Sequence, residues 1–332
     1  MNAARACYHR GLDIDSDIDR ARRLPAALHH DPTWFERVRE RVLARTWHAY
    51  PGPLPSLEAG LALPWNLLPV SIDEPLVLRV DEQGPVLLSN VSTHSGAILV
   101  SRAGNVEALQ CPVDGHTYDR DSLASVPTGR WGPMMWASLD PVHPVGELLE
   151  PLHERLGFRS PETLKPVPTL SREYHVPAGW LAVCEQALRT ASETDDELHL
   201  LPWGSLRIAK AGAEQDALPL PTEHPDHGQR IASYHFWLFP GSSIAVHPWG
   251  VAVELVLPLT PTETRVVCMG FATDPSSIDK ELGIAIDQRV HEAHGRAALV
   301  ARGLRARLYP GSGYTECERA LHHFHRTLAA LL

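Results

Sequence analysis

The 332-residue sequence lacks a block of basic residues, a long apolar run and paired cysteines, and each absence excludes a class of protein. Thirty Lys and Arg against forty Asp and Glu give a formal net charge of −10. Phosphate contacts need clustered Lys and Arg, so the composition argues against a nucleic-acid-binding protein. With 44% hydrophobic and 21% charged residues, the chain is globular rather than disordered or fibrous.

A membrane span needs about 20 consecutive apolar residues, and no segment reaches that length. The most apolar stretch, residues 244–259, is interrupted by two prolines and two polar residues. Residues 1–23 carry alternating charges without an apolar core, which is not the pattern of a signal peptide. The five cysteines are odd in number and widely spaced, with no Cys-x-x-Cys pair. These features predict a cytoplasmic protein with free thiols and no membrane attachment.

The order of apolar patterns predicts an α+β protein. Asp31-Pro32-Thr33 is typical of a helix N-cap, and the following helix is expected to run to Thr46. Between residues 51 and 140, short β-branched runs alternate with Gly-containing turns, which predicts a small antiparallel β domain. We expect a helical segment over residues 1–50 that packs on the C-terminal domain, the β domain over 51–150, and a larger α+β domain over 151–332.

Within the C-terminal domain, the periodicity predicts a long helix over residues 180–200 and a polar, proline-rich surface loop over 208–231. Further strands and two closing helices are expected at 234–239, 250–259, 264–272, 277–302 and 314–332. The histidines at 322, 323 and 325 are predicted to pack or cap rather than bind metal, since helical spacing separates His323 from the other two. His29 and His30 are predicted to lie on the surface.

Two motifs resemble the Rieske domain of ring-hydroxylating oxygenase large (alpha) subunits. They are Asn-Val-Ser-Thr-His-Ser-Gly at residues 90–96 and Cys-Pro-Val-Asp-Gly-His-Thr-Tyr at 111–118. The family patterns are Asn-x-Cys-x-His-Arg-Gly and Cys-Pro-x-His-Gly-Trp-x-Tyr, at the same separation. The resemblance continues through residues 30–47, 234–258, 287–294 and 318–325. It implies a Rieske-like β domain and a START-like catalytic domain with an antiparallel sheet flanked by helices.

The positions that match the family's cluster ligands are Ser92, His94, Cys111 and Asp114. A Rieske 2Fe–2S cluster takes two thiolates on one iron and two imidazoles on the other, so each iron has lost one ligand. A neutral, hard serine hydroxyl is a poor substitute for a thiolate. We therefore predict no cluster. A zinc or hard-metal site that includes His116 is chemically allowed, and a buried thiol with a hydrogen-bonded imidazole is the plainer interpretation.

The family's mononuclear iron has two His ligands and one carboxylate. The matching residues here are Ser192, Glu197 and Asp287, with His199 in place of Glu197 if two residues are inserted. The carboxylate that links the two metal sites in the family corresponds to Arg189, a cation that cannot accept a hydrogen bond from a ligating imidazole. We therefore predict no mononuclear iron and no cofactor.

Four polar residues are expected to face the former iron pocket, namely Glu185, Glu197, His199 and Asp287. One interpretation is metal-independent acid–base chemistry, with His199 as the base and Asp287 and Glu197 orienting it or donating a proton. The other is that ordinary polar residues fill the pocket, including an ion pair between Glu185 and Arg189, four apart on a helix.

Retention of the fold together with loss of the redox ligands predicts a non-redox pseudoenzyme. The resemblance implies head-to-tail trimers in which the cluster of one chain serves the iron of its neighbour. A degenerate chain is expected to form a homo- or hetero-oligomer of this type, with itself or with an intact paralogue, as a scaffold or regulator. The alternatives are a metal-independent enzyme acting on a small aromatic or biosynthetic intermediate, and an oxygenase subunit with unusual ligation.

Overall fold

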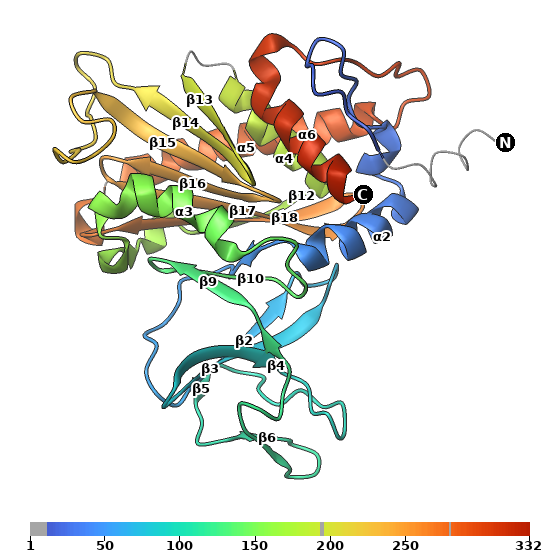
Figure 1. The fold of residues 1–332 in the computed structure, drawn as a ribbon, viewed down its shortest axis with the longest axis vertical. Coiled ribbons are helices and arrows are strands. Elements are labelled where there is room, and N and C mark those ends of the chain that lie inside the picture. The colour runs from blue at the N-terminus through green and yellow to red at the C-terminus, as the bar shows by residue number, and fades with distance from the viewer. Residues whose placement is uncertain (1–11, 193–195, 279) are drawn as a thin grey trace.

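The computed structural model describes residues 12–192, 196–278 and 280–332. A small β domain and a larger α+β domain lie one above the other, and strand β6 lies at the end of the β domain farthest from helices α4, α5 and α6 (Figure 1). No helix in these described ranges is long and apolar enough to cross a lipid bilayer.

The N-terminal segment contains helix α2 (Pro32–Arg41), which follows the short 3-10 helix η1 (Ala26–His29) and precedes η2 (Leu43–Arg45). Asp31 is the N-cap of α2, and its carboxylate accepts a hydrogen bond of 2.7 Å from the Thr33 N–H, as predicted. The helix ends earlier than expected, at Arg41. Arg41 donates to the carbonyl of the last residue, Leu332, at 2.8 Å, so this segment contacts the C-terminal helix.

The β domain contains a five-stranded antiparallel sheet in the order β5-β2-β3-β4-β8. Small sheets β1-β10-β9 and β6-β7 complete it. The strands are β1 (His48–Ala49), β2 (Leu61–Leu67), β3 (Glu74–Asp81), β4 (Gly84–Ser89), β5 (Gly104–Asn105), β6 (Leu109–Gln110), β7 (Thr117–Tyr118), β8 (Ser125–Val126), β9 (Thr128–Trp131) and β10 (Met134–Ala137). A separate apolar cluster around Val77, Leu88 and Cys111 fills its interior.

The C-terminal domain is built on an eight-stranded antiparallel sheet with the path β11-β18-β17-β16-β15-β14-β13, in which β12 also pairs with β18. The antiparallel sheet flanked by helices is the α+β architecture that the sequence predicted. Helices α4, α5 and α6 lie together on one side of the sheet, and α3 lies in front of it (Figure 1). The strands and helices are α3 (Val145–Leu156), β11 (Lys165–Pro166), β12 (Arg172–Val176), α4 (Trp180–Ser192), β13 (Glu197–Leu201), β14 (Gly204–Lys210), β15 (Ile231–Leu238), β16 (Ser242–His247), β17 (Gly250–Thr260), β18 (Glu263–Ala272), α5 (Lys280–Gly303) and α6 (Arg319–Leu331).

The predicted helix over residues 180–200 is wrong in its second half. Helix α4 ends at Ser192, and Glu197–Leu201 form the edge strand β13. These residues pair with β14 from Glu197 opposite Ile208 to Leu201 opposite Gly204. Tertiary pairing with β14 therefore overrides the local helical pattern, because propensity is a weak constraint beside ladder hydrogen bonds. Two of the residues that match iron ligands consequently lie on a strand.

Candidate functional site

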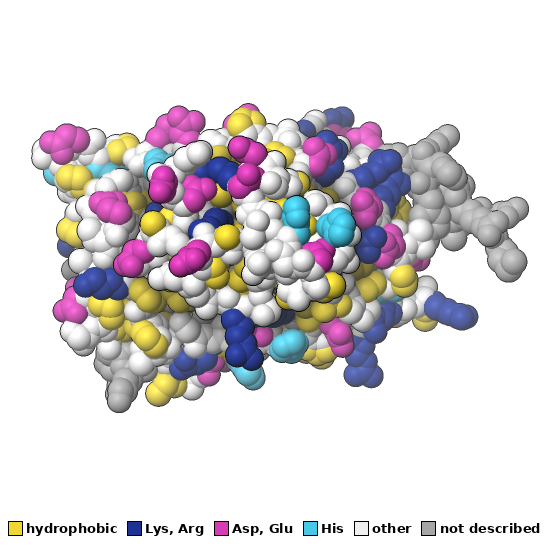
Figure 2. Space-filling model, turned by 90° about the horizontal axis from the view of Figure 1, so that it is seen from below, with side chains coloured by type: hydrophobic (Ala, Val, Ile, Leu, Met, Phe, Trp, Pro, Cys, Tyr) yellow, Lys and Arg dark blue, Asp and Glu magenta, His cyan; other side chains and the backbone are white. Residues whose placement is uncertain are grey.

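Two loops at the tip of the β domain carry the four positions that match cluster ligands. Each turns at a glycine in the left-handed region, Gly96 at φ 73° and Gly115 at φ 74°, which a side chain would disfavour. The Gly96 N–H donates to the Ser92 carbonyl at 2.9 Å, and the Gly115 N–H donates to the Cys111 carbonyl at 3.0 Å. Figure 2, which views the molecule from below, shows neighbouring histidine side chains among acidic and apolar ones. In both loops, a backbone hydrogen bond between residues four apart thus closes a tight turn that contains the positions matching cluster ligands.

The Ser92 hydroxyl forms hydrogen bonds within its own loop and with Tyr118 of the second motif. Its oxygen accepts hydrogen bonds from the N–H groups of Ser95 at 3.0 Å and His94 at 3.3 Å. It also lies 2.8 Å from the Tyr118 hydroxyl. A serine here satisfies the loop's backbone donors, as serine does in local turns.

The two loops are joined by direct side-chain hydrogen bonds. His94 Nδ1 lies 2.6 Å from an Asp114 carboxylate oxygen, and the Ser95 hydroxyl lies 3.1 Å from Cys111 Sγ. The His116 N–H, the Cys111 thiol and His94 all hold the pKa of Asp114 well below its usual range. The Ser95 hydrogen bond lowers the pKa of Cys111. Protein groups therefore bond to one another at the positions where a cluster would bridge the loops.

These donors do not fit a Rieske cluster. The set offers one thiol, one imidazole, one hydroxyl and one carboxyl, whereas the cluster needs two thiolates and two imidazoles. His116 stacks beside His94 with ring centroids 6.4 Å apart and supplies no thiolate. Across the described ranges, no three or more His, Cys, Asp or Glu side chains are arranged to hold a metal ion.

The positions that match iron ligands lie on different elements, with Glu197 and His199 on β13 and Asp287 on α5. The Ser192 side chain lies outside the described part of the structure. His199 Nε2 lies 2.9 Å from Glu197 on the same partly exposed strand. Asp287 lies on α5 and accepts a hydrogen bond from the Tyr174 hydroxyl. Among described residues, no hydrogen bond or ion pair joins Asp287 to Glu197 or His199. The catalytic role assigned to these three residues stays a prediction.

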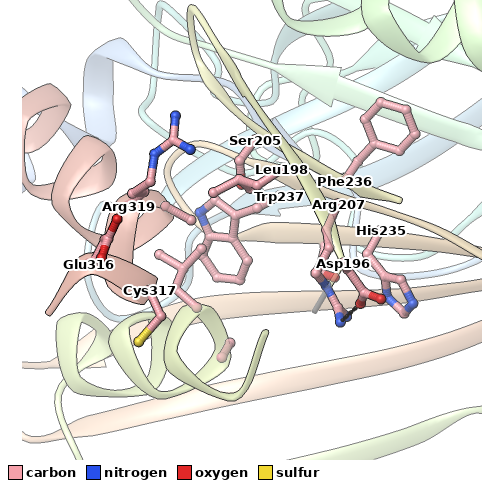
Figure 3. A pocket seen from close by; sticks show the side chains of 14 residues that line it. Asp196, Leu198, Ser205, Arg207, His235, Phe236, Trp237, Glu316, Cys317 and Arg319 are labelled. Carbon is pink, nitrogen blue, oxygen red and sulfur yellow. Dashed lines mark hydrogen bonds and ion pairs between the residues drawn. The ribbon is translucent and has the colours of Figure 1, made fainter. Parts of the chain in front are cut away.

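A cavity of about 350 Å³ lies between the sheet and the helices. It is lined from α4 by Ala187 and Leu188, from the sheet by Leu198, Ser205, Arg207, His235, Trp237 and Ser243, and from the start of α6 by Arg319 and Ala320. Arg207 forms an ion pair of 2.6 Å with Asp196 at one side of this cavity (Figure 3).

Strand alternation decides which residues reach the cavity. Leu198 lines it, so Glu197 and His199, its neighbours along β13, project from the opposite face of the strand. Sequence reasoning missed Arg207 and His235 because their shared face follows from the register of β14 and β15. Burial lowers the pKa of His235 to about 3, so its imidazole is neutral at physiological pH.

Glu185 lies at the centre of a buried polar network rather than among the cavity residues. One carboxylate oxygen lies 2.8 Å from His29 Nε2 and 2.9 Å from His325 Nε2. The Tyr314 hydroxyl bonds to the other nitrogen of His325 at 2.7 Å. The predicted ion pair with Arg189 is present at 3.7 Å. The expectation that His29 lies on the surface is wrong, because it is 5% exposed and contacts a carboxylate 156 residues away.

The charge balance of this network keeps Glu185 ionised. Burial opposes ionisation, but the charges and hydrogen bonds of His29 and His325 outweigh it and hold the pKa of Glu185 well below its usual range. Arg189 also contacts Glu318 at 3.3 Å, so the residue at the family's bridging position is engaged in structural ion pairs. His322 and His323 bond to the carbonyls of Asp15 and Leu201, which confirms their predicted packing role.

The chain is similar to known proteins in the sequence of its C-terminal domain and in its fold. Residues 174–332 match the family described as ring hydroxylating alpha subunit (catalytic domain). The quaternary ammonium Rieske monooxygenase CntA, in complex with its substrate gamma-butyrobetaine, is 17% identical, with a TM-score of 0.76 over 97% of this chain and 99% of that chain. Naphthalene 1,2-dioxygenase from Rhodococcus sp. is 16% identical, with a TM-score of 0.65 over 93% of each chain. No curated protein matches the sequence.

Residues 174–332 therefore belong by sequence to the catalytic domain of the ring-hydroxylating alpha-subunit family, and nearly the whole chain has the fold of the Rieske oxygenases. The family normally uses a Rieske cluster and a mononuclear iron.

Proposed function

We propose that this chain is a non-redox member of its family, a pseudoenzyme that acts as a scaffold or regulator of an intact paralogue. The observation that carries the proposal is the tip of the β domain, where His94 bonds to Asp114 and Ser95 bonds to Cys111 in place of cluster ligation. A chain with one thiol and one imidazole there has no electron carrier to offer a neighbouring subunit.

Assembly with other alpha subunits is the second part of the proposal. One solved structure of the quaternary ammonium monooxygenase is described in terms of inter-subunit electron transfer, at 16% identity and a TM-score of 0.76. In this chain the same tip exposes apolar side chains, with Val113 at 72% and Ile98 at 42%. An apolar, exposed tip favours docking onto another subunit. The four described cysteines are free thiols, the state that a reducing compartment maintains, so the proposal places the protein in the cytoplasm.

We expect Val113→Glu to weaken oligomer formation by at least about tenfold, because a charge would be desolvated at the apolar contact. Native mass spectrometry and analytical ultracentrifugation, with the chain alone and co-expressed with an intact alpha subunit, measure the effect. Val70→Glu is the matched control, since Val70 is 65% exposed in the turn between β2 and β3. A strictly monomeric wild-type chain that does not associate with the intact subunit would exclude the scaffold role.

A metal-independent enzyme is the second candidate, and the retained cavity favours it. The Asp196–Arg207 ion pair and the neutral His235 imidazole line this space, and such groups can hold and move protons. The test is redox-neutral conversion of small aromatic substrates followed by NMR without any reductant. Loss of turnover in Asp196→Asn with retention in His199→Ala would place the chemistry in the cavity. The reverse result would support His199 as the base.

A further inference from the structure

The last turns of helix α5 present arginine and leucine side chains to solvent. Arg296, Leu299 and Arg302 follow one another at a spacing of three residues, so they share one face of the helix. Leu299 is 70% exposed, whereas Ala297 and Ala301 on the opposite face are 0% and 4% exposed. The end of α5 therefore buries alanines against the protein and directs a leucine outward between two arginines.

The segment that follows α5 continues this surface as an ordered loop. The Ala306 N–H donates to the Gly303 carbonyl at 2.9 Å, and the Tyr309 N–H donates to the Ala306 carbonyl at 3.2 Å. Farther along, the Arg23 N–H donates to the Ser312 carbonyl at 3.1 Å and fixes the loop to the N-terminal segment. In Figure 1 this loop joins α5 to α6 at the upper right of the molecule, away from the β domain. Its side chains are thus held in place on an open margin of the protein.

The charge of this region is opposite to that of the whole chain. No acidic residue occurs over residues 293–315, although the chain has a formal net charge of −10. Four arginines occur there, and Arg296 lies 3.9 Å from Glu292 in a partly exposed ion pair. The other three are exposed and form no side-chain hydrogen bond or ion pair with any described residue, namely Arg302, Arg305 and Arg307. The region is therefore a local cationic surface on an acidic protein, and such a surface attracts anions.

Apolar side chains project from the same surface. Leu308 is 94% exposed and Tyr309 is 39% exposed, in addition to Leu299. A single exposed leucine is ordinary on a protein surface, but three exposed apolar side chains among unpaired arginines are not. In a lipid surface, a projecting leucine enters the acyl boundary, a tyrosine ring lies at the headgroup level, and arginines contact anionic headgroups. A protein partner would instead need a matching pocket for a side chain that has almost no contact with its own chain.

We propose that the surface formed by residues 296–309 binds reversibly to membranes that contain anionic lipids, with Leu308 and Tyr309 entering the headgroup region and the arginines contacting the lipid headgroups. A peripheral contact of this kind needs no membrane-spanning segment. The proposal therefore departs from the expectation of no membrane attachment, which rests on the lack of a long apolar run. It goes beyond the proposed function and does not depend on it, because it uses neither the cluster loops nor the cavity.

The test compares vesicles that differ in charge. The full-length protein is sedimented with vesicles of phosphatidylcholine alone and with vesicles that also contain about 30% phosphatidylserine. We expect binding to the anionic vesicles to be at least about tenfold tighter and to weaken as the salt concentration is raised. Equal binding to both vesicles, or no binding at millimolar lipid, would overturn the proposal. Retention on immobilised poly-glutamate without binding to the anionic vesicles would assign the surface to an acidic protein partner and would overturn it as well.

Two variants locate the binding, and each has a matched control. Arg305→Glu reverses one charge of the surface and is expected to weaken binding to the anionic vesicles by at least about tenfold. Arg102→Glu, in the exposed loop between β4 and β5, makes the same charge change and should leave binding unchanged. Leu308→Ser is expected to weaken binding by about fivefold or more, and Val70→Ser, at another exposed apolar side chain, should not. Circular dichroism confirms that each variant is folded. Wild-type affinity in folded Arg305→Glu and Leu308→Ser would show that this surface does not contact the lipid.

Discussion

The double variant Ser92→Cys, Asp114→His is expected to acquire a Rieske cluster, which the proposed function does not expect in the wild-type chain. The two substitutions supply the missing thiolate and the missing imidazole at loops that already turn at Gly96 and Gly115. After anaerobic reconstitution, the variant should hold roughly two irons and two sulfides per chain and show a Rieske-type visible and EPR spectrum. The wild type treated in parallel should hold neither.

Each single variant is the control for the other. Ser92→Cys alone gives two thiolates with one imidazole, and Asp114→His alone gives one thiolate with two imidazoles, so neither completes the set. The double variant also removes the hydrogen bond between His94 and Asp114, which frees the imidazole to ligate. A folded double variant that takes up no iron would show that the loop geometry, and not only the residue identities, has departed from that of the family.

Removal of the Glu185 carboxylate is expected to produce the largest loss of stability of any single substitution considered. Glu185→Ala leaves His29, His325 and Arg189 without their shared acceptor in the interior. Breaking a buried ion pair by removing one partner costs about 3–5 kcal/mol of unfolding free energy. Urea unfolding followed by circular dichroism measures it, and Glu197→Ala, on the exposed edge strand, should change stability by less than about 0.5 kcal/mol. A loss below 1 kcal/mol in Glu185→Ala would show that the network does not hold these segments together.

The same network predicts a dependence on acid. The pKa of Glu185 in the folded state lies well below the ordinary value of 4.5, so its stabilising contribution is complete at pH values above 4.5. The contribution is lost as the pH falls below that value towards the lower folded pKa. The stability difference between wild type and Glu185→Gln should therefore be present above pH 4.5 and shrink as the pH falls below it. A difference that grows in acid would contradict the ionised state of Glu185.

Local motifs and long-range contacts differ in how far the sequence could predict them. The cluster positions lie in two short motifs, so Ser92 and Asp114 could be identified through the resemblance of these motifs to those of the family. The partner of His29 lies 156 residues away on α4, and nothing beside His29 in the sequence indicates burial. Arg207 and His235 share a face only through the register of β14 and β15, which periodicity does not supply. The edge strand β13 likewise depends on its pairing with β14.

The central claim, that this family member has lost its redox centres, is tested most directly by iron and acid-labile sulfide analysis of anaerobically purified wild-type protein, with a visible absorption spectrum of the same sample. The account predicts no sulfide, no stoichiometric iron and no Rieske-type absorption, because the donors at His94, Cys111 and Asp114 bond to protein groups instead. Stoichiometric iron and sulfide with a Rieske-type spectrum would contradict it and would identify the chain as an oxygenase subunit with unusual ligation.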